Sequence, residues 1–529
     1  MRRSTQSINA AALLGGACIV AGLAGAPRQA TAAIFDVTQN TWGTTTDVGS
    51  FAWAIDQANT QAGVDTINVT PGLEISIDGA APAAGTNTWL ARFAESADVQ
   101  GNGAKLVGNP TYVSSGGDLG TKTTILGNPY NPAIKTNDVI VVPGLSFAQI
   151  GTSGSDNSSI SVSFSDLHAD GLASIAQLNE GSQLTVSGGD FVNTVNYTDK
   201  NAAGRAIFEA SNGSTLNLND ISITKNYPFD SAIDIGPDAA IFFGSIQGED
   251  SQLNIQDSTI SDSYGAGAIA WLGGTANIVS SIISDAGGLS ISDSQQEQGV
   301  LNFVNSILYM TGGDDLSQTN RVQAGSGGEA NILASTILYD AISTSELCDN
   351  VSYNCNGMPL TALLGGVLNF ASSAVVPLNA EFTFPGKASY SEFTDGDLVA
   401  GDYSYIGATP TQNAAAVKAL FGNLDILTEG ETYPITDVDP LQFFGQLPAG
   451  AYPLANGVLV GVVPDAGVGG VNQLINPIDG QPILVDVYGN PRVWRDGSRA
   501  IGALQVPAPA VFPLGLLALI GFRFWSRRT

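Results

Sequence analysis

Seven short segments in the middle of the chain share one pattern of apolar and polar positions. Each begins with Ile, Leu or Ala, has a second apolar residue two positions later and a third one seven positions after the first. The segments begin at Ile160, Leu184, Leu216, Leu253, Ala276, Leu301 and Ala330. Successive start positions differ by 23 to 37 residues. A period of this size is typical of solenoids and propellers, in which each repeat is one small structural unit.

The alternation changes phase inside each segment. Positions 0 and 2 point to one side of an extended strand, whereas position 7 has the opposite parity. Between them, position 4 holds residue types that tolerate left-handed backbone: Gly188, Asp220, Asp257, Ser280 and Asn305. We therefore expect a corner at position 4, which turns two short strands toward one core. Units this small are stable only when they stack on neighbours, as in a parallel β-solenoid.

Two further positions favour stacked coils. Position 5 holds mostly small residues, which suit a crowded inner corner: Ser165, Gly189, Ile221, Ser258, Ser281, Ser306 and Ser335. Position 1 holds Asn in five successive segments: Asn217, Asn254, Asn277, Asn302 and Asn331. Coils stacked about 4.8 Å apart would let these amides form a hydrogen-bonded ladder. The alternative is a row of exposed amides that binds sugar hydroxyls.

The pattern predicts an all-β fold: a right-handed, single-stranded parallel β-helix of the pectate-lyase-like type. The right hand follows from the preference of parallel crossovers. Roughly ten coils would form a rod on the order of 50 Å long. We expect a helical cap in front and a smaller β-rich module behind. The predicted divisions are a signal peptide (1–33), the cap and first coils (34–110), the repeats (111–345), the C-terminal module (346–505) and a tail (506–529).

Composition and charge limit the classes of partner that the protein can bind. Gly accounts for 63 of 529 residues and only 13% of residues are charged, against about 25% in an average soluble domain. The net charge is −29, and removing the two end segments takes away six arginines and no acid. Such a surface repels nucleic acid, and it repels anionic polysaccharide unless cations bridge the two. No cofactor is predicted, except that calcium stays open.

The N-terminus has the three parts of a secretory signal peptide. Arg2 and Arg3 precede an apolar run over residues 11–25, and the small-residue stretch ATAA follows at 30–33. We expect signal peptidase to cleave near Ala32 or Ala33.

Two cysteines, Cys348 and Cys355, would remain in the exported chain. They stand in one polar stretch, ELCDNVSYNCNG, separated by six residues. In an oxidising compartment this spacing predicts a local disulfide, since a metal site would need more ligands than the stretch offers.

The C-terminus reads VPAPAVFPLGLLALIGFRFWSRRT, a Pro-rich opening, an apolar run and a basic end. The apolar run is just long enough for a membrane helix if its flanks are included. The segment resembles PEP-CTERM sorting signals of the VPLPA type, through Val506, Pro507 and Pro509 and the basic pair Arg527 and Arg528. The resemblance implies a Gram-negative bacterium, an exosortase-like enzyme that cuts the chain, and delivery to the cell surface or extracellular matrix. A permanent tail anchor is the alternative.

Near the mature N-terminus, GSFAWAIDQANTQAGVDTINVTPGL (49–73) contains an Ala/Asn-rich stretch followed by a DTI strand. It resembles the CSLREA region of bacterial surface β-helix proteins through Asn59, Gly63 and DTINV. The resemblance implies a small helix laid over the open end of the first coil, where it would cover edge strands.

Residues 452–467 and 485–505 resemble the terminal module of choice-of-anchor Q proteins. Members of that family usually end in Asp-Ile-Gly-Ala-x-Glu, whereas this chain has AIGALQ at 500–505 and so lacks both carboxylates. The resemblance implies an architecture and a mode of anchoring, and it implies no biochemical activity.

Some parallel β-helices are polysaccharide lyases or hydrolases, so the fold alone does not decide whether this chain is an enzyme. The strongest candidates are Asp314, Asp315 and Arg321, which could form a calcium site beside a base. The alternative for these three residues is a solvated turn. The chain has no GHG or RIK motif of the polygalacturonase type, and its one histidine, His168, is expected on the surface or in a turn.

Two segments are candidate binding loops. Residues 226–245 offer Tyr227, Phe229, Asp230 and Asp234 as carbohydrate contacts, with an irregular extra coil as the alternative. A second segment spaces its acids like a calcium loop but lacks the closing glutamate; these acids are Asp395, Asp397 and Asp402.

The sequence favours an exported, cell-surface structural or adhesin-like protein without enzymatic activity, sorted through its C-terminus and associated with exopolysaccharide. One alternative is a lyase or glycoside hydrolase acting on acidic polysaccharide. Another is a calcium-dependent carbohydrate-binding module without catalysis. The expected partners are signal peptidase, an exosortase-like enzyme and extracellular polysaccharide, with membrane contact only through the tail.

Overall fold

The structure is a computed structural model of the chain. It describes residues 32–81, 83, 89–108, 111–114, 139–142, 145–152, 157–172, 174–192, 195–197, 207–211, 213–229, 239–244, 251–263, 267–286, 289–292, 298–311, 322–340, 360–377, 391–394, 397–400, 405–406, 444–447, 450–453, 463, 465–493 and 497–504.

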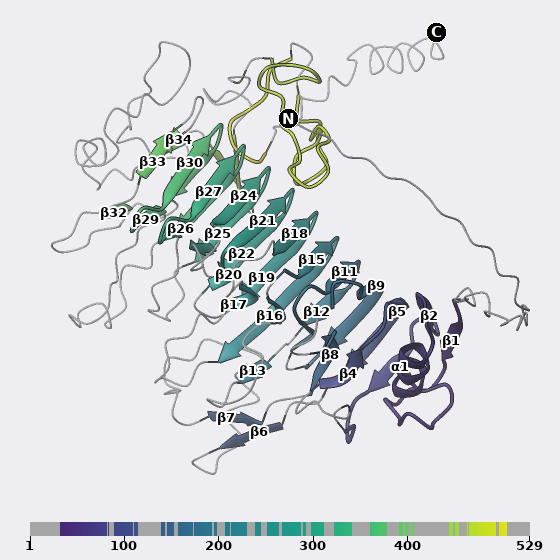
Figure 1. Cartoon of the computed structure of the whole chain (residues 1–529). Coiled ribbons are helices and arrows are strands. Elements are labelled where there is room, and N and C mark those ends of the chain that lie inside the picture. Colours follow the sequence, from purple (N-terminus) through teal and green to yellow (C-terminus); the bar gives the residue numbers. More distant parts are fainter. Residues whose placement is uncertain are drawn as a thin grey trace, which may run out of the picture.

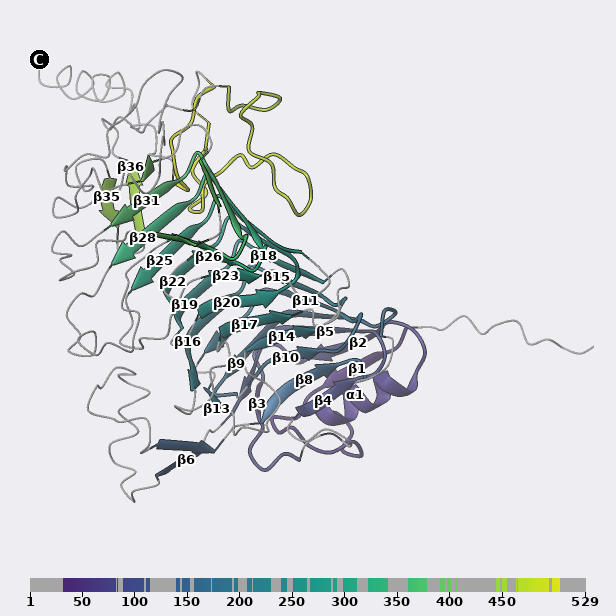
Figure 2. The same ribbon diagram turned by 60° about the vertical axis from the view of Figure 1, so that its left-hand side comes forward.

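These residues form a stack of short parallel strands around one axis, a parallel β-helix (Figures 1 and 2). Within the described ranges the strands make a 22-stranded and a 10-stranded parallel sheet, and the larger sheet bends into two ladders. We call the three faces ladder one, ladder two and ladder three. Each turn of the chain adds one strand to each ladder, so the predicted fold is confirmed.

Ladder one consists of β1 (Ile34–Val37), β2 (Asp65–Val69), the first part of β5 (Ala97–Val107), the first part of β9 (Ser161–Asp170), β11 (Gln183–Ser187), β15 (Thr215–Asn219), β18 (Gln252–Gln256), β21 (Gly274–Val279), β24 (Gly299–Val304), β27 (Glu329–Leu333), β30 (Val367–Ala371) and β33 (Asp397–Ala400). Ladder two consists of β3 (Glu74–Ser76), the ends of β5 and β9, β12 (Asp190–Val192), β16 (Ser222–Phe229), β19 (Thr259–Ser263), β22 (Ile282–Ala286), β25 (Ile307–Thr311), β28 (Thr336–Asp340), β31 (Ala374–Pro377) and β34 (Tyr405–Ile406). Ladder three consists of β4 (Trp89–Phe93), β8 (Ser146–Ile150), β10 (Ala176–Leu178), β14 (Phe208–Ser211), β17 (Ala239–Gly244), β20 (Gly267–Leu272), β23 (Leu289–Ser292), β26 (Val322–Gly325), β29 (Leu360–Leu363) and β32 (Ser391–Thr394).

Few described strands lie outside the ladders. β13 (Val195–Tyr197) pairs with the end of β16. Two antiparallel hairpins join β6 (Thr111–Ser114) to β7 (Val139–Val142) and β35 (Phe444–Leu447) to β36 (Gly450–Pro453).

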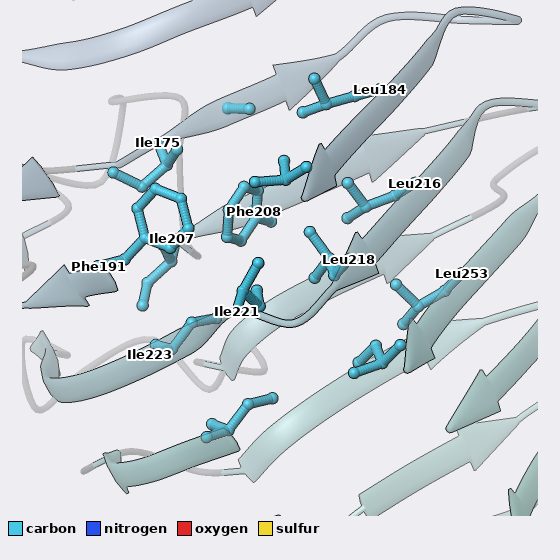
Figure 3. Packing of buried hydrophobic residues seen from close by; sticks show 14 of the residues in the cluster. Ile175, Leu184, Phe191, Ile207, Phe208, Leu216, Leu218, Ile221, Ile223 and Leu253 are labelled. Carbon is cyan, nitrogen blue, oxygen red and sulfur yellow. The ribbon is translucent and has the colours of Figure 1, made fainter. Parts of the chain in front are cut away.

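The core is built from columns of equivalent residues. Leu184 lies over Leu216, Leu216 over Leu253, and the column continues through Ala276, Leu301, Ala330 and Leu368. All of these side chains are fully buried. Figure 3 shows Leu184, Leu216 and Leu253 on three consecutive strands, with Phe191 and Ile223 of the next ladder facing the same interior. The predicted stacking of positions 0 and 7 is confirmed, and it extends one coil beyond the seven segments to Leu368.

Position 4 is the corner between ladders one and two. Its residues have left-handed backbone, with φ between 47° and 72°: Asp166, Gly188, Asp220, Asp257, Ser280, Asn305, Ala334 and Ser372. In a strand every second side chain points to the core. A single left-handed residue shifts this alternation by one position, which explains why the apolar pattern breaks at this point.

One segment starts two residues later than the sequence pattern suggested. Leu184 pairs with Val162, whereas Ile160 lies in the turn before β9, where its amide donates to Asn157 O at 2.8 Å. Ile160, Val162 and Phe164 alternate without interruption, so the pattern alone fitted two registers. The corner residue of this coil is Asp166, and Ser165 is therefore not at position 5.

Asparagines on the outer side of ladder one form the predicted ladder. Each Nδ2 donates to the Oδ1 of the preceding coil, at 2.8 Å in four of the five steps and 3.1 Å in the other. The ladder runs through Asn217, Asn254, Asn277, Asn302, Asn331 and Asn369. Because Asn254 and Asn277 are also buried, the structural interpretation holds for this row.

Position 5 forms a second polar row inside the corner. Each buried serine hydroxyl donates to the carbonyl two residues earlier and accepts the amide of the preceding coil, as Ser281 does with Val279 O at 2.8 Å and Ser258 N at 3.2 Å. The row comprises Ser258, Ser281, Ser306, Ser335 and Ser373. A side chain without a hydroxyl group would leave these corner amides without this acceptor.

A helix closes the N-terminal end of the rod. α1 (Phe51–Thr60) is the one helix among the described residues, and the Ser50 hydroxyl caps it by accepting from Trp53 N at 3.2 Å. Its buried face places Phe51 against Phe147 of ladder three, with the ring centroids 5.8 Å apart. The helix lies across the first coil beside β1 and β4 (Figure 1), as the resemblance to the CSLREA region implied.

The Asn ladder gives a direct test of stacking. Asn277→Ala removes two ladder bonds and leaves Asn254 Oδ1 and Asn302 Nδ2 without their partners. We expect the free energy of unfolding, measured by urea denaturation, to fall by about 1–3 kcal/mol. Thr275→Ala, on the same strand and the same outer face, is the control and should cost much less. Equal costs for the two variants would show that the amides do not stabilise the stack.

Candidate functional site

Most sequence-predicted site residues lie outside the described part of the chain, and their placement stays a prediction. This applies to the catalytic candidates, the two cysteines, most of the binding and calcium candidates and the sorting motif: Asp314, Asp315, Arg321, Cys348, Cys355, Asp230, Asp234, Asp395, Asp402, Val506, Pro507, Pro509, Arg527 and Arg528.

Three predicted site residues fall within strands, although only their backbone is described. Tyr227 and Phe229 lie in the last part of β16, where they pair with Val195 and Tyr197 of β13. Asp397 begins β33 and pairs with Val367. β16 and β17 are the ladder-two and ladder-three strands of one regular turn of the stack, so no extra coil is inserted there, and a carbohydrate contact by these residues stays a prediction.

The structure assembles an ionic cluster that the sequence did not reveal, on the outer face of ladder two. His168 lies between two carboxylates, with Nε2 3.4 Å from Asp166 Oδ1 and Nδ1 3.2 Å from Asp190 Oδ2. The neighbouring strand places Lys105 beside His168, and Lys105 Nζ donates to Asp170 Oδ2 at 2.7 Å. We call these five residues the His168 cluster.

Hydrogen bonding orients the imidazole of His168. The amide of Asp190 donates to Nδ1 at 3.0 Å, so the neutral ring carries its proton on Nε2, which faces Asp166. The lysine is neutralised by its own carboxylate partner. The side chains are partly exposed, and exposed pairs of this kind contribute about 0–1 kcal/mol each. The geometry is that of one ion pair, Lys105 with Asp170, next to a hydrogen-bonded histidine, on strands of three coils.

The described residues contain neither a metal-binding cluster nor a membrane-spanning helix. Among them, no group of three or more His, Cys, Asp or Glu side chains could hold a metal ion. In the same ranges, no helix is long and apolar enough to cross a membrane.

The C-terminal module lies along the side of the rod rather than behind it. Within the predicted range 346–505, the strands β29 to β34 belong to the ladders. We use the name C-terminal module for residues 463, 465–493 and 497–504, which are mostly turns with three antiparallel bridges. Leu474 packs against Val279, Val304 and Ala334, with Ile478 and Ile483 beside it. Asn305 Nδ2 also donates to Val485 O at 3.0 Å. The module thus covers the corner between ladders one and two over several coils, as the yellow loops in Figure 2 show.

The sequence of the rod changes where the module covers it. Position 3 points outward and is polar in the first coils, at Ser187, Asn219 and Gln256. In the next coils the same column holds Val279, Val304 and Leu333. Val279 and Val304 are buried although they face away from the core. This polar-to-apolar change is the sequence signal that could have located the docking surface.

A buried arginine joins the module to the corner. Arg492 Nη1 donates to Ala503 O at 2.8 Å and Nη2 donates to Ala334 O at 3.0 Å and to Gly502 O. Gly502 has φ of +88°, and a Cβ there would lie 2.6 Å from Thr336 Oγ1. Only glycine therefore allows this close approach.

A second arginine, Arg499, is buried with part of its guanidinium group left without hydrogen bonds among the described residues. Within the described residues, its Nε and Nη1 and the Nε of Arg492 have no hydrogen-bond partner. Burial lowers the pKa of Arg499 to about 10. Burial and the neighbouring Arg499 charge lower the pKa of Arg492 well below its usual value, with Asp486 opposing them. The two charges therefore disfavour each other inside the module, and the carbonyl bonds of Arg492 offset part of this cost.

Comparison with known proteins adds no further constraint. No family model, curated protein or solved structure matches the chain. The fold itself defines the class, which is a parallel β-helix protein with a folded-back C-terminal module.

The docking surface can be tested with one substitution. Val304→Gln gives the column the side chain that Gln256 has, and it removes a buried contact worth about 1.5–3 kcal/mol. We expect residues 465–493 to exchange their amide hydrogens faster while the ladder amides stay protected. The control is Ser187→Gln, which introduces glutamine at the equivalent position of a coil that the module does not cover. Unchanged exchange in the module of the Val304 variant would show that this contact does not hold it.

The two buried arginines should respond in opposite ways. Arg492→Met leaves the carbonyls of Ala334, Gly502 and Ala503 without their donor, and we expect the free energy of unfolding to fall by at least about 2 kcal/mol. Arg499→Met removes a poorly paired buried charge, so urea denaturation should give an equal or higher value. A larger loss for Arg499→Met than for Arg492→Met would contradict the assignment.

Proposed function

We propose that this chain is an exported, cell-surface structural or adhesin-like β-helix protein that is sorted through its C-terminal signal. The observation that supports this most is the continuity of the stack from Ile34 to Ile406, with ladder residues in register from coil to coil. Ten strands in ladder three, about 4.8 Å apart, give a rod on the order of 45 Å long. Such a rod can hold loops at a distance from the surface that anchors it.

The longest interruptions of the stack are consistent with display. They separate β5 from β8, β12 from β14, β28 from β29 and β31 from β32, and each one follows a strand, or the end of a strand, that belongs to ladder two. Insertions in repeat proteins often gather on one binding face. We propose that this edge of the rod makes the contact with extracellular polysaccharide or another cell surface.

The two ends of the chain support the proposed route. The signal peptide would direct export, and the PEP-CTERM-like tail would hold the chain at the inner membrane of a Gram-negative bacterium until an exosortase-like enzyme acts. The acidic body, with net charge −29 before processing, would remain soluble outside the cell.

Enzymatic activity is the rival function, with Asp314, Asp315 and Arg321 as its candidates from the sequence. The purified exported protein is mixed with uronate polymers, with and without calcium, and unsaturated and reducing ends are followed over time. We expect no product, and binding of the polymer without turnover would fit the proposal. Sustained turnover that His168→Ala, Asp314→Ala or Arg321→Ala abolishes would contradict it. Calcium-raised Tm together with calcium-dependent binding and no product would indicate the third function, a calcium-dependent module.

Location tests the other half of the proposal. We expect cell fractionation and intact-mass measurement to find the chain at the cell surface or in the matrix, without its signal peptide. A chain that stays in the cytoplasm with an unprocessed N-terminus would contradict export.

A further inference from the structure

Asp65, the first residue of β2, is an acid in a fully buried position within the first coil. Its Oδ1 accepts a hydrogen bond of 2.7 Å from Ala33 N. Its Oδ2 is also buried, and no described residue forms a hydrogen bond with it. The next strand of ladder one places Ala97 opposite Asp65, so the residue paired with it there carries no charge.

Both the amide and the carbonyl of Ala33 form hydrogen bonds with residues of β2. Its carbonyl accepts from Thr66 N at 2.8 Å, while its amide donates to Asp65. These contacts extend the pairing of β1 with β2 by one residue beyond Ile34 (Figure 1). Ala32, the residue before it, is exposed. The described chain thus enters the fold at Ala33.

A single neutral amide is a poor partner for a buried carboxylate. A buried charge is costly unless an opposite charge and enough hydrogen bonds compensate it. If the nitrogen of Ala33 were a free α-ammonium, it would supply a positive charge and three donors in place of one. It would already lie within hydrogen-bond distance of Oδ1, and a second donor could serve Oδ2.

We propose that signal peptidase cleaves the bond between Ala32 and Ala33, and that the new α-ammonium of Ala33 forms a buried ion pair with Asp65. One water is consumed: the carbonyl carbon of Ala32 becomes a carboxylate and the nitrogen of Ala33 becomes an ammonium. This proposal rests on the proposed export of the chain. Processing then completes the first coil, because the ion pair exists only after the signal peptide has left.

The neighbouring bonds fit less well. Ala30 and Ala32 form the small-x-small pattern that precedes a signal-peptidase site, which selects the bond before Ala33. Cleavage one residue later would place the terminus at Ile34, whose side chain is 69% exposed, and would remove both contacts of Ala33 with β2. Cleavage one residue earlier would place the charge on the exposed Ala32.

The first test is the N-terminal sequence of the full chain after secretion. We expect a single terminus at Ala33. A terminus at Ala32 or Ile34 on an exported chain would overturn the inference and leave the proposed export standing.

The second test compares chains with different first residues, and it does not depend on export. Chains that begin at Ala33, Ala32 or Ile34 and end at Thr529 are released from an N-terminal fusion without extra residues and melted in mild detergent. We expect the Ala33 chain to have a Tm several degrees above the other two. Equal Tm values for the Ala33 and Ala32 chains would overturn the inference.

Two substitutions separate the ion pair from other effects of the terminus. Asp65→Asn should remove the difference in Tm between the Ala33 and Ala32 chains. Asp78→Asn, which removes an exposed acid near the same end, should preserve it. A difference that persists in the Asp65→Asn background would contradict the pairing, and if that variant does not fold, the comparison of the unsubstituted chains still decides.

Discussion

Everything in this molecule depends on the vertical register of parallel strands. Because Leu216 lies over Leu184 and Leu253 over Leu216, each coil buries the apolar face that its neighbour exposes. The same register stacks amide on amide and hydroxyl on amide, which produces the Asn ladder and the row of buried serines. A slip of one residue would turn every core side chain outward. The left-handed residue at each corner keeps both adjoining strands facing inward, since it reverses the parity where the chain changes direction.

On the outside of the rod, polarity and charge differ between the columns of equivalent residues and also along a single column. An outward column that is polar in the first coils becomes apolar at Val279 and Val304, and there the C-terminal module docks. On the next face, strand pairing brings Lys105 beside His168, although the two are 63 positions apart in sequence. Columns of this kind explain how a repetitive core carries different surfaces. They are consistent with a rod that binds its C-terminal module on one side and displays loops on another.

Repetition decided which parts of the structure could be predicted from the sequence. The coil template, the corner residues and the Asn ladder recur with the period of the fold, so several copies support one interpretation. Where a single copy was ambiguous, as at Ile160, Val162 and Phe164, the register was placed two residues too early. His168 and Asp190 lie side by side on neighbouring coils, so the misplaced register of that coil hid their contact. Arg492 reaches Ala334 from a segment outside the repeats, and sequence pattern could not find this contact because it forms only when the module docks.

The most direct test of the stack is a disulfide between adjacent coils. Gln252 and Thr275 are paired neighbours on the outer side of ladder one, and parallel neighbours lie about 4.8 Å apart, within the range that a disulfide spans. Cysteines at these two positions should oxidise to an intramolecular bond that peptide mapping identifies. Cysteines at Gln252 and Val300, two coils apart, should not. Efficient bonding of the second pair and none of the first would contradict a column of coils in register.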